Sequence, residues 1–136
     1  MIYVIQILSF LFAFACAVHD CPAIDNFTFY GSDEKQQKRF HLFNGLLKSC
    51  FVGAVFICGG WMTATLSALI IYMVFDPVVA IFRTVFTPPK KPWYYLSTKG
   101  IDGFLVKALG QKAGLYKAAF CLVLIIALNI IYYGNA

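Results

Sequence analysis

Few side chains in this chain have the type and spacing that a catalytic site requires. The 136 residues include five cysteines and two histidines. They form no recognisable Ser/His/Asp arrangement, no glycine-rich phosphate loop and no convincing carboxylate pair. The cysteines also lack the C-x-x-C spacing that is typical of metal sites. His19 lies near two of them, but a histidine alone does not make a metal site without that spacing. We therefore expect no enzyme, no metal and no cofactor.

The cysteines could still form a disulfide. Three of them fall near one predicted membrane face, namely Cys16, Cys21 and Cys50. An oxidising compartment on that side would permit a bond between two of them. Cys58 and Cys121 lie inside apolar stretches, where we expect them to pack as small apolar side chains.

Asn26 is a second candidate for covalent modification. It begins an Asn-Phe-Thr acceptor pattern for N-glycosylation, which only a secretory compartment would use. A mitochondrial protein would leave the same asparagine bare, so the pattern favours a secretory compartment.

The composition indicates whether the chain folds in water or in a membrane. The chain is 61% hydrophobic, 18% aromatic and only 12% charged, with a mean hydropathy of +0.77. A soluble domain carries roughly 25% charged residues, so this chain has too little polar surface to be one. Disorder is excluded as well, because disordered chains are poor in aromatic residues and rich in charge. The chain belongs in a bilayer.

Three stretches without a charged residue could cross that bilayer, and they are 2–18, 49–75 and 118–136. A helix rises ~1.5 Å per residue and the hydrocarbon is about 30 Å thick, so ~20 apolar residues suffice. We expect an all-α integral membrane protein forming a single membrane domain over 1–136. It would have about three transmembrane helices and two short interfacial amphipathic helices.

The first stretch could instead be a cleaved signal peptide. It ends in Ala15-Cys16-Ala17, which resembles the small-x-small pattern of a cleavage site. However, no Lys or Arg precedes the apolar run, so the positive region of a signal peptide is missing. This favours a retained membrane helix.

The charges on the two connections predict their sides of the membrane. The 19–48 loop has four basic and four acidic residues, whereas the 76–117 connection has seven basic residues against two acidic ones. By the positive-inside rule, the 76–117 connection faces the cytosol or the mitochondrial matrix. With three spans, the 19–48 loop and the C-terminus then face the lumen or the intermembrane space.

The middle stretch allows two interpretations. Gly59-Gly60 falls near its centre, and a hairpin bent there would put both connections on one side. Each arm within 49–75 would hold only about a dozen residues, too few to cross. This favours one helix that tolerates the glycines.

The same stretch contains small residues at helical spacing. They are Gly60, Ala64, Ser67 and Ala68. Small residues repeated every four positions allow two membrane helices to approach closely. The face could dock onto a partner protein or onto another helix of this chain.

Two short amphipathic helices are expected in the 76–117 connection. Asp76 would cap the first, Pro77 would occupy its first position, and Pro88-Pro89 would end it. The second would cover 101–109 and end at Gly110. A basic and aromatic belt at the lipid headgroups accompanies them, comprising Arg83, Lys90, Lys91, Trp93, Tyr94 and Tyr95.

The three predicted spans contain no Asp, Glu, Lys, Arg or His. Pumps and ion transporters usually keep ionisable groups in their membrane helices, so neither function is favoured. Gln6 and Asn129 are the strongest polar groups in the spans, and we expect each to bond to a neighbouring helix.

Residues 70–126 resemble part of the small Golgi COPI-associated membrane proteins and the related Flower family. The resemblance rests on Ile70-Ile71-Tyr72 leading to Asp76-Pro77, then on Gly103-Phe104-Leu105, Leu109-Gly110 and Ala113-Gly114-Leu115-Tyr116. It covers under half of the chain. The family has four spans where three are predicted here, and the 19–48 loop has no counterpart in it. The resemblance implies a role in Golgi or vesicle membranes.

These observations favour a non-catalytic accessory subunit of a larger membrane complex, with the mitochondrial inner membrane slightly preferred to the Golgi and other endomembranes. The expected partners are other membrane subunits and anionic lipids, and no nucleic acid. A Golgi or vesicle trafficking protein is the first alternative. A small homo-oligomeric channel, suggested by the small-residue face, is the second.

Overall fold

The computed structural model describes residues 2–25, 34–86, 92–96 and 100–134, and side chains over most of these ranges. Every described residue outside 92–96 lies in a helix, and none lies in a strand. Three helices are long and apolar enough to cross a membrane, with spans at Ile2–His19, Leu42–Phe82 and Asp102–Gly134. The expectation of an all-α integral membrane protein is confirmed.

The first and last spans fall close to their predicted positions. Helix α1 covers Ile2–Asp25, and α5 covers Ala113–Gly134. Both segments are helical throughout these bounds, and an α-helix makes its backbone hydrogen bonds within the segment, as a membrane span requires. Helix α5 begins at Ala113, before the charge-free stretch, and therefore includes Lys117.

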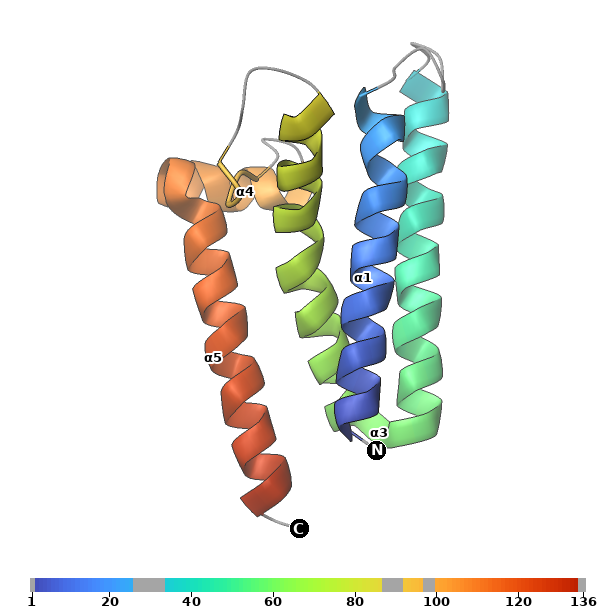
Figure 1. Ribbon diagram of the computed structural model, residues 1–136, viewed down its shortest axis with the longest axis vertical. Coiled ribbons are helices and arrows are strands. Elements are labelled where there is room, and N and C mark those ends of the chain that lie inside the picture. Colours follow the sequence, from blue (N-terminus) through green and yellow to red (C-terminus); the bar gives the residue numbers. More distant parts are fainter. Residues whose placement is uncertain (1, 26–33, 87–91, 97–99, 135–136) are drawn as a thin grey trace.

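Helix α3, Glu34–Phe86, does not cross as one straight rod, and the expectation of a single helix over 49–75 is wrong. Gly60 has φ 78° and ψ −176°, a conformation that is essentially confined to glycine. The Lys48 ammonium lies 3.1 Å from the centre of the Phe75 ring, although a straight helix would separate these residues by roughly 40 Å. The chain therefore folds back at Gly60 into two adjacent arms, residues 34–59 and 61–86 (Figure 1).

The arms are long enough because they extend beyond the charge-free stretch. Within the apolar window of α3, the part from 42 to 59 rises roughly 27 Å and the part from 61 to 82 roughly 33 Å. Each arm is too short to cross only if it is limited to the charge-free stretch 49–75. The structure accommodates Lys48 and Asp76 inside the arms by giving both side chains partners.

The fold-back changes the predicted arrangement of the ends. The turn at Gly60, the start of α1 and the end of α5 lie at one end of the bundle, and α4 lies at the other (Figure 1). The end of α1 and the start of α3 also lie toward the α4 end, so the described parts of 19–48 lead to the same side of the bundle as the end of α3 and α4 (Figure 1). We call this the charged end, because every Lys, Arg, Asp and Glu falls within 20–48 or 76–117.

The two predicted interfacial helices have different outcomes. The second is confirmed as α4, Gly100–Leu109, which ends at Gly110 with φ 72° and leads through a short 3-10 turn, η1 (Gly110–Lys112), into α5. The first is not separate, because α3 continues through Pro77 to Phe86. Asp76 is therefore not an N-cap. Neighbouring helices allow a membrane helix to tolerate an internal proline.

Helix α1 packs against both arms of α3. The core cluster consists of Ala13, Ile70, Ile71 and Val74. The hydroxyl of Ser9 donates to that of Ser67 at 2.8 Å, and the rings of Phe12 and Phe51 stack at 4.2 Å. These contacts fix α1 in register with both arms.

Helix α5 contacts the bundle near each of its ends. At the end away from α4, the Gln6 amide donates to the Asn129 amide oxygen at 2.7 Å, and the rings of Tyr3 and Tyr133 stack at 5.4 Å. The expectation that Gln6 and Asn129 bond to neighbouring helices is confirmed, and they bond to each other. At the charged end, α5 is held by Lys117.

Candidate functional site

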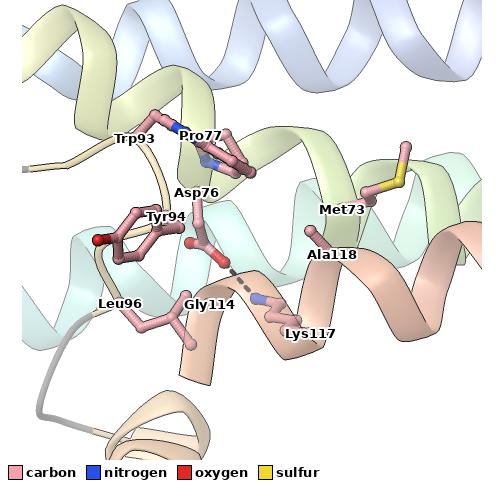
Figure 2. A pocket seen from close by; sticks show the side chains of 9 residues that line it. All are labelled: Met73, Asp76, Pro77, Trp93, Tyr94, Leu96, Gly114, Lys117 and Ala118. Atoms are coloured by element: carbon pink, nitrogen blue, oxygen red, sulfur yellow. Dashed lines mark hydrogen bonds and ion pairs between the residues drawn. The ribbon is translucent and has the colours of Figure 1, made fainter. Parts of the chain in front are cut away.

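The site with the most chemistry is a cluster of charges at the charged end, which we call the Lys117 cluster (Lys117, Asp76, Asp102 and Tyr72). Lys117 lies in the second turn of α5, and its ammonium forms an ion pair with Asp76 of α3 (Figure 2). The Lys117 side chain is only 5% exposed and that of Asp76 is 23% exposed. A buried lysine requires such a partner, because water cannot solvate its charge.

Helix α4 adds a second carboxylate to the cluster. The Lys117 ammonium lies 3.3 Å from Asp102 Oδ1, and the Asp102 side chain is 21% exposed. Asp102 lies in the first turn of α4, where a negative charge is favoured by the helix dipole. One lysine thus joins three separate elements, which are α3, α4 and α5.

Tyr72 completes the cluster from one turn earlier in α3. The Lys117 ammonium lies 3.4 Å from the centre of the Tyr72 ring, and the Tyr72 hydroxyl donates to Asp102 Oδ1 at 3.4 Å. Lys117 is thus surrounded by two carboxylates and the face of an aromatic ring, all of which favour its charged form.

Lys48 extends this network to the first arm of α3. It lies over the Phe75 ring and acts electrostatically on Asp76. Positive and negative groups therefore alternate across the charged end, from Lys48 through Asp76 and Lys117 to Asp102. The network connects both arms of α3 with α4 and α5.

A small cavity adjoins the ion pair and has room for about one water molecule. Trp93 and Tyr94 lie on one side of Asp76, and Gly114 and Lys117 lie on the other (Figure 2). The segment 92–96 contains a tight turn, in which the Tyr95 amide donates to the Pro92 carbonyl at 2.9 Å. This turn covers the ion pair.

Gly114 allows the turn to lie directly on α5. A Cβ at this position would overlap the Tyr94 carbonyl oxygen and crowd the Leu96 side chain. Leu96 is 5% exposed, so the turn is anchored by an apolar side chain as well as by its backbone.

The geometry is that of a structural tie between α3, α4 and α5. Removing one member of a buried ion pair leaves an uncompensated charge and costs roughly 3–5 kcal/mol. The adjoining cavity is too small for a substrate beyond water. The expectation of spans without ionisable groups is wrong, because Lys48, Asp76 and Lys117 lie inside the spanning helices.

The predicted small-residue face is divided by the fold-back. Ala64 is 7% exposed and Ser67 is 1% exposed, and Ser67 bonds to Ser9 of α1. Gly60 forms the turn, and Ala68 is exposed. The buried half of this face is therefore an internal contact with α1.

The matching face on α1 was missed in the sequence. Ser9, Ala13 and Ala17 are fully buried against α3. They recur every four residues, which is the same spacing that identified the small residues of α3. This spacing is visible in the sequence and predicts a second small-residue face on the first helix.

The predicted disulfide is not formed between Cys16 and Cys50. Both are thiols, with Cys16 buried and Cys50 exposed. Cys121 is 2% exposed and packs as a small core side chain, as expected, but Cys58 is exposed close to the turn at Gly60. The side chain of Cys21 lies outside the described residues.

Only the aromatic part of the predicted interface belt can be placed. Trp93 is 47% exposed, Tyr94 and Tyr95 are half-buried, and the rings of Trp93 and Tyr94 meet edge to face at 5.6 Å. Arg83, Lys90 and Lys91 lie outside the side chains that the structure describes, as does Asn26.

No family model, curated protein or solved structure matches this chain.

Proposed function

We propose that this integral membrane protein is a non-catalytic accessory subunit of a larger membrane complex. The observation that carries the proposal is the pairing of polar groups between helices. Ser9 bonds to Ser67, Gln6 to Asn129, and Lys117 to two carboxylates. These groups hold the helices together, whereas a pump or channel would direct such groups toward an ion or a water-filled path.

The surface of α5 supports an assembly role. Only 11% of the apolar window in the Asp102–Gly134 span, which includes α5, is buried within the chain, compared with 33% of the window in the Leu42–Phe82 span of α3. Its exposed side chains are large and apolar, and they include Phe120, Val123, Ile126 and Ile130. Such a face is compatible with a neighbouring transmembrane helix.

A native gel of detergent-solubilised membranes, followed by mass spectrometry, tests the accessory role. The chain should migrate within a complex much larger than itself, and the co-migrating proteins should identify the organelle. We propose the mitochondrial inner membrane first. Migration of the intact chain as a small species in several mild detergents would contradict an accessory role.

A Golgi or vesicle membrane protein is the second candidate, and the fold-back at Gly60 favours it. The COPI-associated and Flower-type proteins that residues 70–126 resemble have four spans. Here α1, the two arms of α3 and α5 provide four membrane-length segments. The difference in the number of spans from that family is thereby removed, whereas the 19–48 loop still has no counterpart in it.

An added glycosylation acceptor distinguishes the two organelles. If the charged end faces the cytosol, the C-terminus faces the lumen, and an Asn-x-Thr tag joined there should acquire a glycan in the endomembrane system. The same tag in the mitochondrial inner membrane should remain unmodified. A matched Gln-x-Thr tag controls for other changes in mobility.

The homo-oligomeric channel gains no support from the fold. Its basis was the face formed by Gly60, Ala64 and Ala68, but Ala64 packs inside the chain and Gly60 forms the turn. We do not propose it further.

A further inference from the structure

Helix α4 has a fixed orientation at the charged end. Asp102 is drawn inward by Lys117 and Tyr72, and Gly103 beside it is buried. Phe104 is then turned outward and is 72% exposed, and Leu109 at the end of the helix is 48% exposed. The helix lies across the bundle rather than along it (Figure 1). This is the geometry of a helix lying in the membrane interface.

Two lysines accompany this apolar face. Lys107 in α4 and Lys112 in η1 are both exposed. The structure gives neither of them a carboxylate partner within the described residues, in contrast to Lys117, which has two. In this combination, large apolar side chains enter the acyl-chain region of the bilayer, and the exposed ammonium groups beside them bind lipid phosphates.

The side of the membrane provides the complementary charge. No Lys or Arg falls within 1–19, 49–75 or 118–136, the segments that lead to the Gly60 end, so the positive-inside rule directs the charged end to the cytosol or matrix. The cytoplasmic leaflet is the one that carries anionic phospholipids. We propose that α4 and η1 form a binding surface for anionic phospholipid headgroups, with Lys107 and Lys112 contacting the phosphate and Phe104 and Leu109 entering the lipid. This proposal does not depend on the accessory role.

Two tryptophans make the proposal directly testable. Trp93 lies beside Gly114 and Lys117, close to η1, and is 47% exposed. Trp61 follows the turn at Gly60 at the opposite end and is 64% exposed. Each can serve as the sole tryptophan of its own variant, excited selectively at about 295 nm to avoid tyrosine, with Trp61→Phe to observe Trp93 and Trp93→Phe to observe Trp61.

The experiment places the full chain in phosphatidylcholine nanodiscs that contain a headgroup-spin-labelled lipid, either phosphatidylserine or phosphatidylcholine. Labelled phosphatidylserine should quench Trp93 more strongly than labelled phosphatidylcholine, and the two should quench Trp61 equally. The preference at Trp93 should decrease as salt is added.

Charge variants identify the residues responsible. Each lysine should contribute about fivefold to the preference for the anionic lipid, so Lys107→Gln with Lys112→Gln should reduce it by about 25-fold. The charge-preserving pair Lys107→Arg and Lys112→Arg should retain it. These side chains are exposed, so neither pair should alter folding, which circular dichroism checks.

Three results would overturn the proposal. The first is equal quenching of Trp93 by the two labelled lipids. The second is an undiminished preference in the doubly neutralised variant. The third is loss of the preference when millimolar inorganic phosphate is added at constant ionic strength, which would assign the site to a soluble anion instead of a lipid.

Discussion

Lys117 shows how a single residue determines the arrangement of one end of the molecule. Its ammonium contacts carboxylates from α3 and α4 and lies over the Tyr72 ring, yet its side chain is only 5% exposed. A charge that has lost its water must keep these partners, so the three elements are held in one relative position. A sequence read by local pattern does not reveal this, because Asp76, Asp102 and Lys117 are far apart in the chain.

The ion pair between Lys117 and Asp76 should be strongly coupled. Lys117→Met leaves Asp76 without its main partner and should lower the free energy of unfolding by about 3 kcal/mol, the lower end of the usual range because Asp76 is partly exposed. Adding Asp76→Asn should restore part of the loss, because the uncompensated charge is removed. Unfolding by SDS in mixed micelles measures both effects.

Lys107→Met provides the matched control for that cycle, because Lys107 is exposed and should change stability by less than 0.5 kcal/mol, about the usual limit for surface substitutions. Additive effects of Lys117→Met and Asp76→Asn would show that the pair makes no energetic contribution.

Gly114 makes a second prediction at the residue scale. Gly114→Ala should displace the turn at 92–96, because the added Cβ would overlap the Tyr94 carbonyl oxygen. We expect a loss of stability of about 1–3 kcal/mol, in the range for overpacking, together with a shift in Trp93 emission in the Trp61→Phe background. Gly134→Ala, where a Cβ meets nothing within 4 Å, is the control. An unchanged emission spectrum would contradict the close contact.

Among the elements, α3 is the one whose form depends most on a single position. The two arms are continuous in sequence pattern, and only the backbone conformation of Gly60 separates them. Thr63 supports the turn by donating its hydroxyl to the Gly60 carbonyl at 2.9 Å. The glycine pair suggests a bend, but the choice between bend and straight helix depends on whether charged residues can enter the spans.

Gly60→Ala should therefore destabilise the fold by about 1–3 kcal/mol, because alanine is strained at φ 78°. Gly53→Ala, in the first arm, should have the opposite sign and stabilise by about 0.5–1 kcal/mol, because a Cβ there meets no neighbour and alanine favours the helix. Unfolding in mixed micelles compares the two. A stabilising Gly60→Ala would contradict the turn.

The elements that the sequence predicts well are those with local signals. The end of α4 at Gly110 and the end of α3 just before Pro88-Pro89 follow from glycine and proline positions. The separation of residues 78–86 from α3 was wrong, because Asp76-Pro77 has the same pattern as a helix start. Only the partner on α5 shows that Asp76 faces inward, and no local pattern identifies that partner.

At the scale of the whole molecule, the fold-back determines the topology. It places the turn at Gly60, the start of α1 and the end of α5 at one end of the bundle and α4 at the other (Figure 1). The sequence has no Lys, Arg, Asp or Glu within 1–19, 49–75 or 118–136, which are the segments that lead to the Gly60 end. This distribution agrees more fully with the positive-inside rule than three alternating spans do, because no basic residue remains on the opposite side.

The reaction of cysteines with a membrane-impermeant maleimide tests this topology most directly. The full chain would carry one cysteine at a time, either the native Cys58, which is exposed close to the turn, or Trp61→Cys, or Gln111→Cys at the charged end. Sealed vesicles of known orientation are treated from outside, and then after permeabilisation.

The fold-back predicts that Cys58 and Trp61→Cys are labelled from one side and Gln111→Cys from the other. A single straight helix through 49–75 would place residues 58 and 61 near the bilayer centre. If neither reacts from either side while Gln111→Cys does, the fold-back is wrong.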